Sequence, residues 1–143
     1  MPWYEYTPRP GGTPLPMVQV VIWHGARFAR LLALVDSGAD SSLIDYGYAE
    51  LLGLDPNNAE KDTAIGASGN SFEVYRWPNA GLELQFEARR FPFQGDFAKF
   101  ANNGEGMNLM GRKDFFRQYM IQFWDAWELM QIDLSPDQAQ PVT

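Results

Sequence analysis

The chain has 143 residues, of which 45% are hydrophobic and 15% aromatic, so it is long and apolar enough to form one domain with a buried core. Its formal charge of −7 argues against nucleic-acid binding, which needs concentrated lysine and arginine. The absence of cysteine excludes a disulfide framework, a thiolate metal site and a cysteine nucleophile, and a single histidine excludes a site built on two or three histidines. No signal pattern or membrane-length apolar run occurs, so we expect a cytoplasmic protein that does not bind membranes.

Residues 1–16 contain five prolines and two adjacent glycines, a composition that is incompatible with a helix or a central strand. Trp3, Tyr4 and Tyr6 are costly to leave in water, which favours an arm that lies on the body of the fold or on a partner. A loosely ordered terminus is the alternative.

The next segment predicts a β-hairpin that ends at a carboxylate. Residues 17–23 alternate in polarity, so Val18 and Ile22 share one face of a strand. After a short turn, residues 27–35 form the returning strand. That strand is apolar at its end and leads directly into Asp36.

The remaining pattern predicts short strands and two small helices. In chain order we expect a strand at 41–44, a helix at 46–52, a hairpin of 59–65 and 71–77, a strand at 81–88, one or two strands within 91–100, an apolar run at 107–110, a helix at 112–119, and a closing hairpin of 120–124 and 127–134. The chain therefore predicts an all-β domain, a barrel or a sandwich, over residues 17–134. A polar tail follows at 135–143.

Asp36 is the main candidate for chemistry. A carboxylate at the end of an apolar strand is costly unless it is paired or used. Ser37 adds a hydroxyl group beside it, and Gly38 permits a sharp turn and the close approach of other groups. By contrast, His24 falls at a predicted hairpin turn, where we expect a solvated side chain without a catalytic role.

The Val-Asp-Ser-Gly-Ala-Asp sequence at residues 35–40 resembles the catalytic signature of the retropepsin family, the single-domain aspartic peptidases. Two later features match in order. The glycine-bearing hairpin tip at residues 65–69 is similar to the family's flap, and Asn-Leu-Met-Gly-Arg at residues 108–112 is similar to its second motif. The resemblance spans about residues 17–134 and implies a retropepsin-like acid-protease β-barrel.

The resemblance also implies a homodimer, because the chain contains one Asp-Ser-Gly triplet where two-domain aspartic peptidases have two. Asp36 of each protomer would meet across a two-fold axis, and the two carboxylates would share one proton. The implied activity is aspartic endopeptidase cleavage of peptide or protein substrates by an activated water. No metal or other cofactor is needed for it.

The resemblance assigns roles residue by residue. Ser37 would cross-link the two active-site loops, Gly38 would leave room for the substrate backbone, and Gly111 and Arg112 would support the loop, Arg112 by pairing with Asp40. The catalytic set is Asp36, Ser37 and Gly38, and the substrate-binding set is Ala39, Asp40, Ile65, Gly66, Ala67, Ser68, Gly69, Leu109 and Met110. Leu109 and Met110 would either line substrate pockets or pack behind Asp36.

Two other interpretations remain. The chain could be a non-catalytic retropepsin-fold module that dimerises or binds extended peptides by strand addition. A less favoured alternative is a monomeric β-barrel in which Asp36 is structural. The retention of Asp, Ser and Gly together favours the enzyme.

Overall fold

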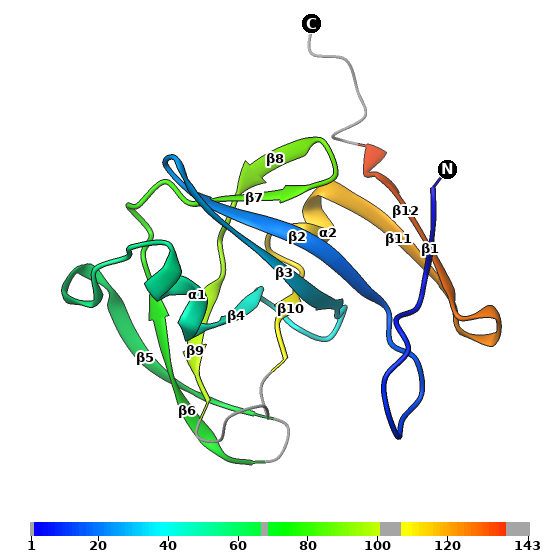
Figure 1. Cartoon of the computed structure of the whole chain (residues 1–143), viewed down its shortest axis with the longest axis horizontal. Helices are drawn as coiled ribbons and strands as arrows, with labels where there is room; N and C mark the ends of the chain where they lie inside the picture. Colours follow the sequence, from blue (N-terminus) through cyan, green and yellow to red (C-terminus); the bar gives the residue numbers. More distant parts are fainter. Residues whose placement is uncertain (1, 67–68, 101–106, 137–143) are drawn as a thin grey trace, which may run out of the picture.

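The computed structural model describes residues 2–66, 69–100 and 107–136 of the chain. It confirms a mainly β fold with short helices (Figure 1). The strands are β1 (Trp3–Glu5), β2 (Met17–His24), β3 (Arg27–Val35), β4 (Leu43–Asp45), β5 (Glu60–Ile65), β6 (Ser71–Arg76), β7 (Glu83–Phe86), β8 (Arg89–Pro92), β9 (Asp96–Lys99), β10 (Leu109–Met110), β11 (Tyr119–Trp124) and β12 (Leu129–Leu134). The helices are α1 (Tyr46–Leu51) and α2 (Phe115–Gln118), with 3₁₀ turns η1 (Pro56–Asn58) and η2 (Asp125–Trp127). None of the helices in these residues is long and apolar enough to cross a membrane.

The β2–β3 hairpin forms as the sequence predicted. Its antiparallel register runs from the pair Met17 and Leu34 to the pair His24 and Arg27. Alternate residues of a strand point to opposite faces of the sheet, and away from the turn every second side chain is buried, at positions 18, 20 and 22 of β2 and 29, 31, 33 and 35 of β3. The hairpin therefore presents the residue after Val35 at one end and His24 at the other.

In the larger sheet, β10 lies between β3 and β4. The strand order is β5-β6-β9-β4-β10-β3-β2-β7-β8. β10 runs parallel to β3, with Leu109 beside Leu34 and Met110 beside Val35, and antiparallel to β4. The loop of residues 36–42, which joins β3 to β4, must therefore pass across the end of β10. This topology brings residues 36–42 against residues 110–113.

Packing around this crossing is apolar. Helix α1 contacts β3, β4 and β9. Phe97 of β9, Ile44 of β4, Met110 of β10 and Phe115 of α2 are fully buried. Burying such side chains contributes about 1.5–3 kcal/mol each, so the end of β3 is held on a rigid base.

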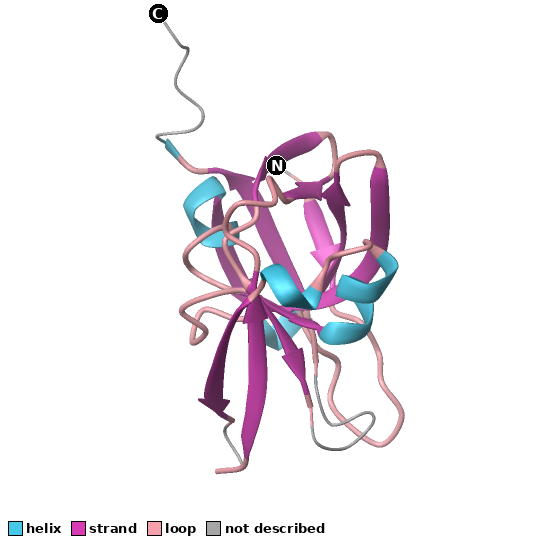
Figure 2. Cartoon of the chain, turned by 90° about the vertical axis from the view of Figure 1, so that its left-hand side faces the viewer, coloured by secondary structure: helices cyan, strands magenta, loops and turns pink. Residues whose placement is uncertain are grey.

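The β5–β6 hairpin extends beyond this base. Figure 2 shows its two strands fanning out from the rest of the molecule together with β9. The pairing runs from Glu60 opposite Arg76 to Ile65 opposite Ser71, and β6 pairs with β9.

The N-terminal arm lies on the body of the fold. β1 pairs with β12 at the edge of a separate three-stranded sheet, β1-β12-β11. Tyr6, just after β1, is 8% exposed, and Thr7 pairs with Leu15 across the proline-rich loop. The prolines therefore interrupt the arm without preventing its edge strand, since an edge strand has one unpaired side.

Several predicted elements are shorter than the sequence pattern indicated, among them the last strand, predicted at 127–134 and observed at Leu129–Leu134 after the 3₁₀ turn η2. The helix predicted at 112–119 covers only Phe115–Gln118, because Asp114 caps it and the backbone N–H groups of residues 112 and 113 donate to Ala39 and Asp40 in the loop between β3 and β4. The strand predicted at 81–88 covers only Glu83–Phe86, because Glu87 has a φ of 53° and turns the chain into β8. The alternating pattern continues into that turn, so periodicity alone could not locate the end of the strand.

Candidate active site

Asp36 has an anchored backbone and an available side chain. Its N–H donates to the carbonyl of Met110 at 3.0 Å, and the N–H of Val35 donates to the carbonyl of Pro16 at 2.9 Å. The half-buried carboxylate accepts a hydrogen bond from the N–H of Gly38 at 2.9 Å. It has no basic partner among the residues that the structure describes. The described residues thus fix the backbone of Asp36 and give its carboxylate no cationic partner.

The loop that carries Asp36 is fastened to residues 111–113. The N–H groups of Arg112 and Lys113 donate to the carbonyls of Ala39 and Asp40 at 3.0 and 2.9 Å. The side chains of Arg112 and Asp40 also form an ion pair at 2.5 Å, as the family resemblance implied, although both are well exposed. The backbone bonds therefore define the loop more strongly than the ion pair does, because exposed pairs contribute only about 0–1 kcal/mol.

Gly111 permits this close contact. A Cβ atom at Gly111 would lie 2.5 Å from the carbonyl carbon of Ser41 and 2.9 Å from the carbonyl oxygen of Ala39. Because these are backbone atoms, any larger residue would push the Asp36 loop away. The predicted supporting role of Gly111 has this steric basis.

A buried polar pair that the sequence analysis missed lies beneath the loop. The hydroxyl group of Ser42 donates to the carboxylate of Asp114 and accepts from the N–H of Gly111 at 3.0 Å. The same carboxylate accepts from the N–H groups of Phe115 at 2.7 Å and Gln94 at 3.2 Å. Burial raises the pKa of Asp114, while these hydrogen bonds oppose the rise. Asp114 is an N-cap, and an Asp before an apolar helical run was the available signal.

The remaining predicted residues lie at the end of β3, in the Asp36 loop and at the β5–β6 tip. Leu109 and Met110 lie beside the end of β3, where Met110 is fully buried behind Asp36 and Leu109 is partly exposed. Ser37 is exposed and makes no hydrogen bond within the described residues. Ile65, Gly66 and Gly69 are at the β5–β6 tip and share no hydrogen bond or ion pair with the loop in the part of the chain described. Ala67 and Ser68 lie outside the described residues.

The β5–β6 tip combines an exposed apolar side chain with a glycine in the left-handed region. Ile65 is 75% exposed, which is unusual for a large apolar side chain. The N–H of Gly66 donates to the carbonyl of Asn70, and Gly69 has a φ of 85°, a conformation that glycine adopts most readily. The tip therefore presents an apolar side chain on a tight turn.

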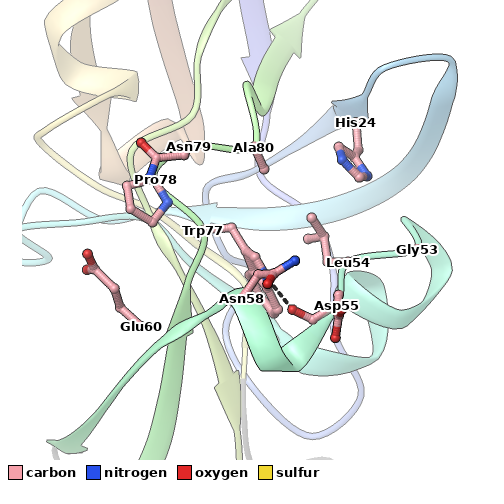
Figure 3. A pocket seen from close by; sticks show the side chains of 10 residues that line it. All are labelled: His24, Gly53, Leu54, Asp55, Asn58, Glu60, Trp77, Pro78, Asn79 and Ala80. Carbon is pink, nitrogen blue, oxygen red and sulfur yellow. Dashed lines mark hydrogen bonds between the residues drawn. The ribbon is translucent and has the colours of Figure 1, made fainter.

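A cavity of about 560 Å³ lies beside Asp36 and Ser37. A second cavity, of about 590 Å³, lies around His24, Asp55 and Trp77 (Figure 3). His24 pairs with Arg27 at the opposite end of the β2–β3 hairpin from Asp36, nine residues or about 30 Å along β3 at 3.3 Å per residue. The imidazole is half-buried, with Nδ1 at 2.7 Å from the carbonyl oxygen of Leu52, so the expectation of a solvated histidine was wrong.

Comparisons with known proteins found no matching family model and no matching curated protein. Among the described residues, no group of three or more histidine, aspartate or glutamate side chains is arranged to hold a metal ion. The geometry around Asp36 is therefore the basis for a functional proposal.

Proposed function

We propose that this chain is an aspartic endopeptidase of the retropepsin type, active as a homodimer in which the Asp36 side chains of two copies face each other. The observation that carries the proposal is the contrast at Asp36 between an anchored backbone and an uncompensated, half-exposed carboxylate. A structural aspartate would be expected to have the saturated hydrogen bonding of Asp114.

The reaction follows from two adjacent carboxylates that share one proton. The ionised carboxylate accepts a proton from a water molecule as the water oxygen attacks the carbonyl carbon of the peptide. The protonated carboxylate donates a hydrogen bond to the carbonyl oxygen and stabilises its developing charge. Transfer of a proton to the leaving nitrogen then breaks the C–N bond and releases an amine and a carboxylic acid.

Other residues support this chemistry in the proposal. Ser37, whose hydroxyl group is exposed, reaches the equivalent loop of the second copy. Gly38 leaves space over the dyad, and Asp40, braced by Arg112, contacts the substrate backbone. The β5–β6 tip closes over the bound peptide and excludes water, with Ile65 as its apolar contact.

The test is digestion of an unfolded protein substrate between pH 3 and pH 7 by the wild type and by Asp36→Asn. Glu50→Gln is the matched control, because Glu50 is exposed on α1 and removing its charge leaves the Asp36 loop untouched. We expect cleavage by the wild type and by Glu50→Gln, and a loss of at least 1000-fold in Asp36→Asn. Equal cleavage by Asp36→Asn, or none by the wild type, refutes the enzyme and leaves a peptide-binding module.

A mixing experiment tests the half-site directly. Addition of excess Asp36→Asn protein to the wild type should suppress cleavage, because heterodimers contain only one ionisable member of the dyad. Sedimentation should show dimers under the same conditions. An active enzyme that stays monomeric, or that excess Asp36→Asn protein does not inhibit, would contradict the shared dyad.

A further inference from the structure

The cavity beside Asp36 combines apolar walls with an acidic lining. We propose that this cavity is a subsite for a positively charged side chain, arginine or lysine, of an extended peptide substrate. This inference rests on the proposed function. The lining residues come from the N-terminal arm, the end of β3, the end of β11 and the β11–β12 turn, and they include Tyr6, Leu15, Asp36, Phe123, Asp125 and Glu128.

The two sides of this cavity are built before any ligand arrives. The hydroxyl group of Tyr6 donates to Oδ1 of Asp125 at 2.5 Å, and the N–H of Tyr6 donates to the carbonyl of Glu128 at 2.8 Å. Thr7 and Leu15 exchange two backbone hydrogen bonds, and the carbonyl of Pro16 accepts from Val35. The arm is therefore tied to the β11–β12 turn at one end and to the catalytic strand at the other. A preformed pocket of this kind loses little entropy on binding.

The charge of the lining selects the ligand. Asp36, Asp125 and Glu128 are acidic, and no lining residue is basic. The nearest basic side chain of the arm, Arg9, donates from Nε to the carbonyl of Thr13 at 2.8 Å and lies close to Gly12. Arg112 is paired with Asp40. The cavity thus has an excess of negative charge, which a guanidinium or ammonium group would balance.

The apolar walls fit the rest of such a side chain. Leu15, Val35 and Phe123 provide surfaces for an aliphatic stem, while Asp125 and Glu128 receive the charged end. A volume of about 560 Å³ is ample for one arginine side chain. The pocket adjoins Asp36, so a peptide lying across the dyad can place a side chain in it.

Binding of peptides to the Asp36→Asn protein tests the inference without requiring cleavage, and this variant retains Asp125 and Glu128. The probes are fluorescent octapeptides that contain one arginine, scanned through each position, and the same peptides with citrulline in its place. Citrulline has nearly the same shape but no charge. For at least one position we expect the arginine peptide to bind five- to tenfold more tightly. Equal affinities at every position overturn the inference.

Variants locate the effect. Asp125→Asn combined with Glu128→Gln should reduce the arginine preference to less than twofold. The amide introduced by Asp125→Asn still offers an oxygen to the Tyr6 hydroxyl group, so the arm stays attached. Glu50→Gln, which also removes charge, should retain the preference. A preference that survives the double change, or that Glu50→Gln abolishes equally, assigns it to overall charge and refutes the subsite.

The outcomes separate the two proposals. Arginine preference in binding without Asp36-dependent cleavage by the wild type would refute the peptidase and retain the subsite. Asp36-dependent cleavage without arginine preference would retain the peptidase and refute the subsite.

Discussion

Replacement of Gly111 by alanine should detach the Asp36 loop from its support. The added Cβ atom would lie 2.5 and 2.6 Å from the carbonyl carbon and oxygen of Ser41 and 2.9 Å from the carbonyl oxygen of Ala39. These atoms can move away only if the hydrogen bonds from Arg112 to Ala39 and from Lys113 to Asp40 lengthen or break. Overpacking costs about 1–3 kcal/mol, and each lost hydrogen bond about 1 kcal/mol. We expect the free energy of unfolding to fall by about 3 kcal/mol.

Urea unfolding followed by fluorescence of the five tryptophans measures this change. Gly47→Ala is the control. Its Cβ atom would meet only the end of the Asp45 side chain, at 2.9 Å, and alanine favours the helix by about 0.5–1 kcal/mol. We expect Gly47→Ala to change stability by less than about 1 kcal/mol. A Gly111→Ala protein as stable as the control would refute the close packing of the loop on residues 111–113.

Two further predictions concern charged groups at the loop. A double-mutant cycle with Asp40→Asn and Arg112→Gln should give a coupling free energy of no more than about 1 kcal/mol that decreases with added salt, since both side chains are exposed; a larger, salt-insensitive coupling would contradict the exposed geometry. For Asp114, the pKa in the folded state is raised above 3.8, so the protonated group contributes stability that is present below pH 3.8 and is lost as the pH rises through the folded-state value. Urea unfolding from pH 3 to pH 7 measures the difference in the free energy of unfolding between the wild type and Asp114→Asn, and the advantage of the wild type should shrink as the pH rises. An advantage that grows with pH would show that the pKa of Asp114 is lowered in the folded state.

The sequence contained strong signals for the hairpin that carries Asp36. The alternation of polar and apolar side chains predicted β2. The apolar run at the end of β3 predicted that Asp36 lies directly after a strand. These signals are local and follow from the two-residue period of a strand. The ends of β7 and α2 were wrong, because a left-handed Glu87 and the hydrogen bonds of residues 112 and 113 depend on neighbours that periodicity does not record.

The parts of the site that were missed depend on contacts between distant segments. Ser42 and Asp114 are 72 residues apart, and only the insertion of β10 between β3 and β4 brings them together. The pairing of Asp40 with Arg112 was expected only from the resemblance to a family. The cavity at Asp36 was not predicted, because its walls come from the proline-rich arm and from the turn that follows β11.

The two aspartates at this crossing differ in a way that separates structure from chemistry. Asp114 is 2% exposed and accepts hydrogen bonds from Ser42, Gln94 and Phe115, so its removal would leave several buried donors without partners. Within the described part of the chain the Asp36 carboxylate accepts one hydrogen bond, from Gly38, while the N–H of Asp36 donates to the carbonyl of Met110. Its replacement by asparagine should therefore cost little stability. Among the described residues the Asp36 side chain has no cationic partner, and the proposed dyad does not supply one, because the second Asp36 would bring another carboxylate and the two would share one proton.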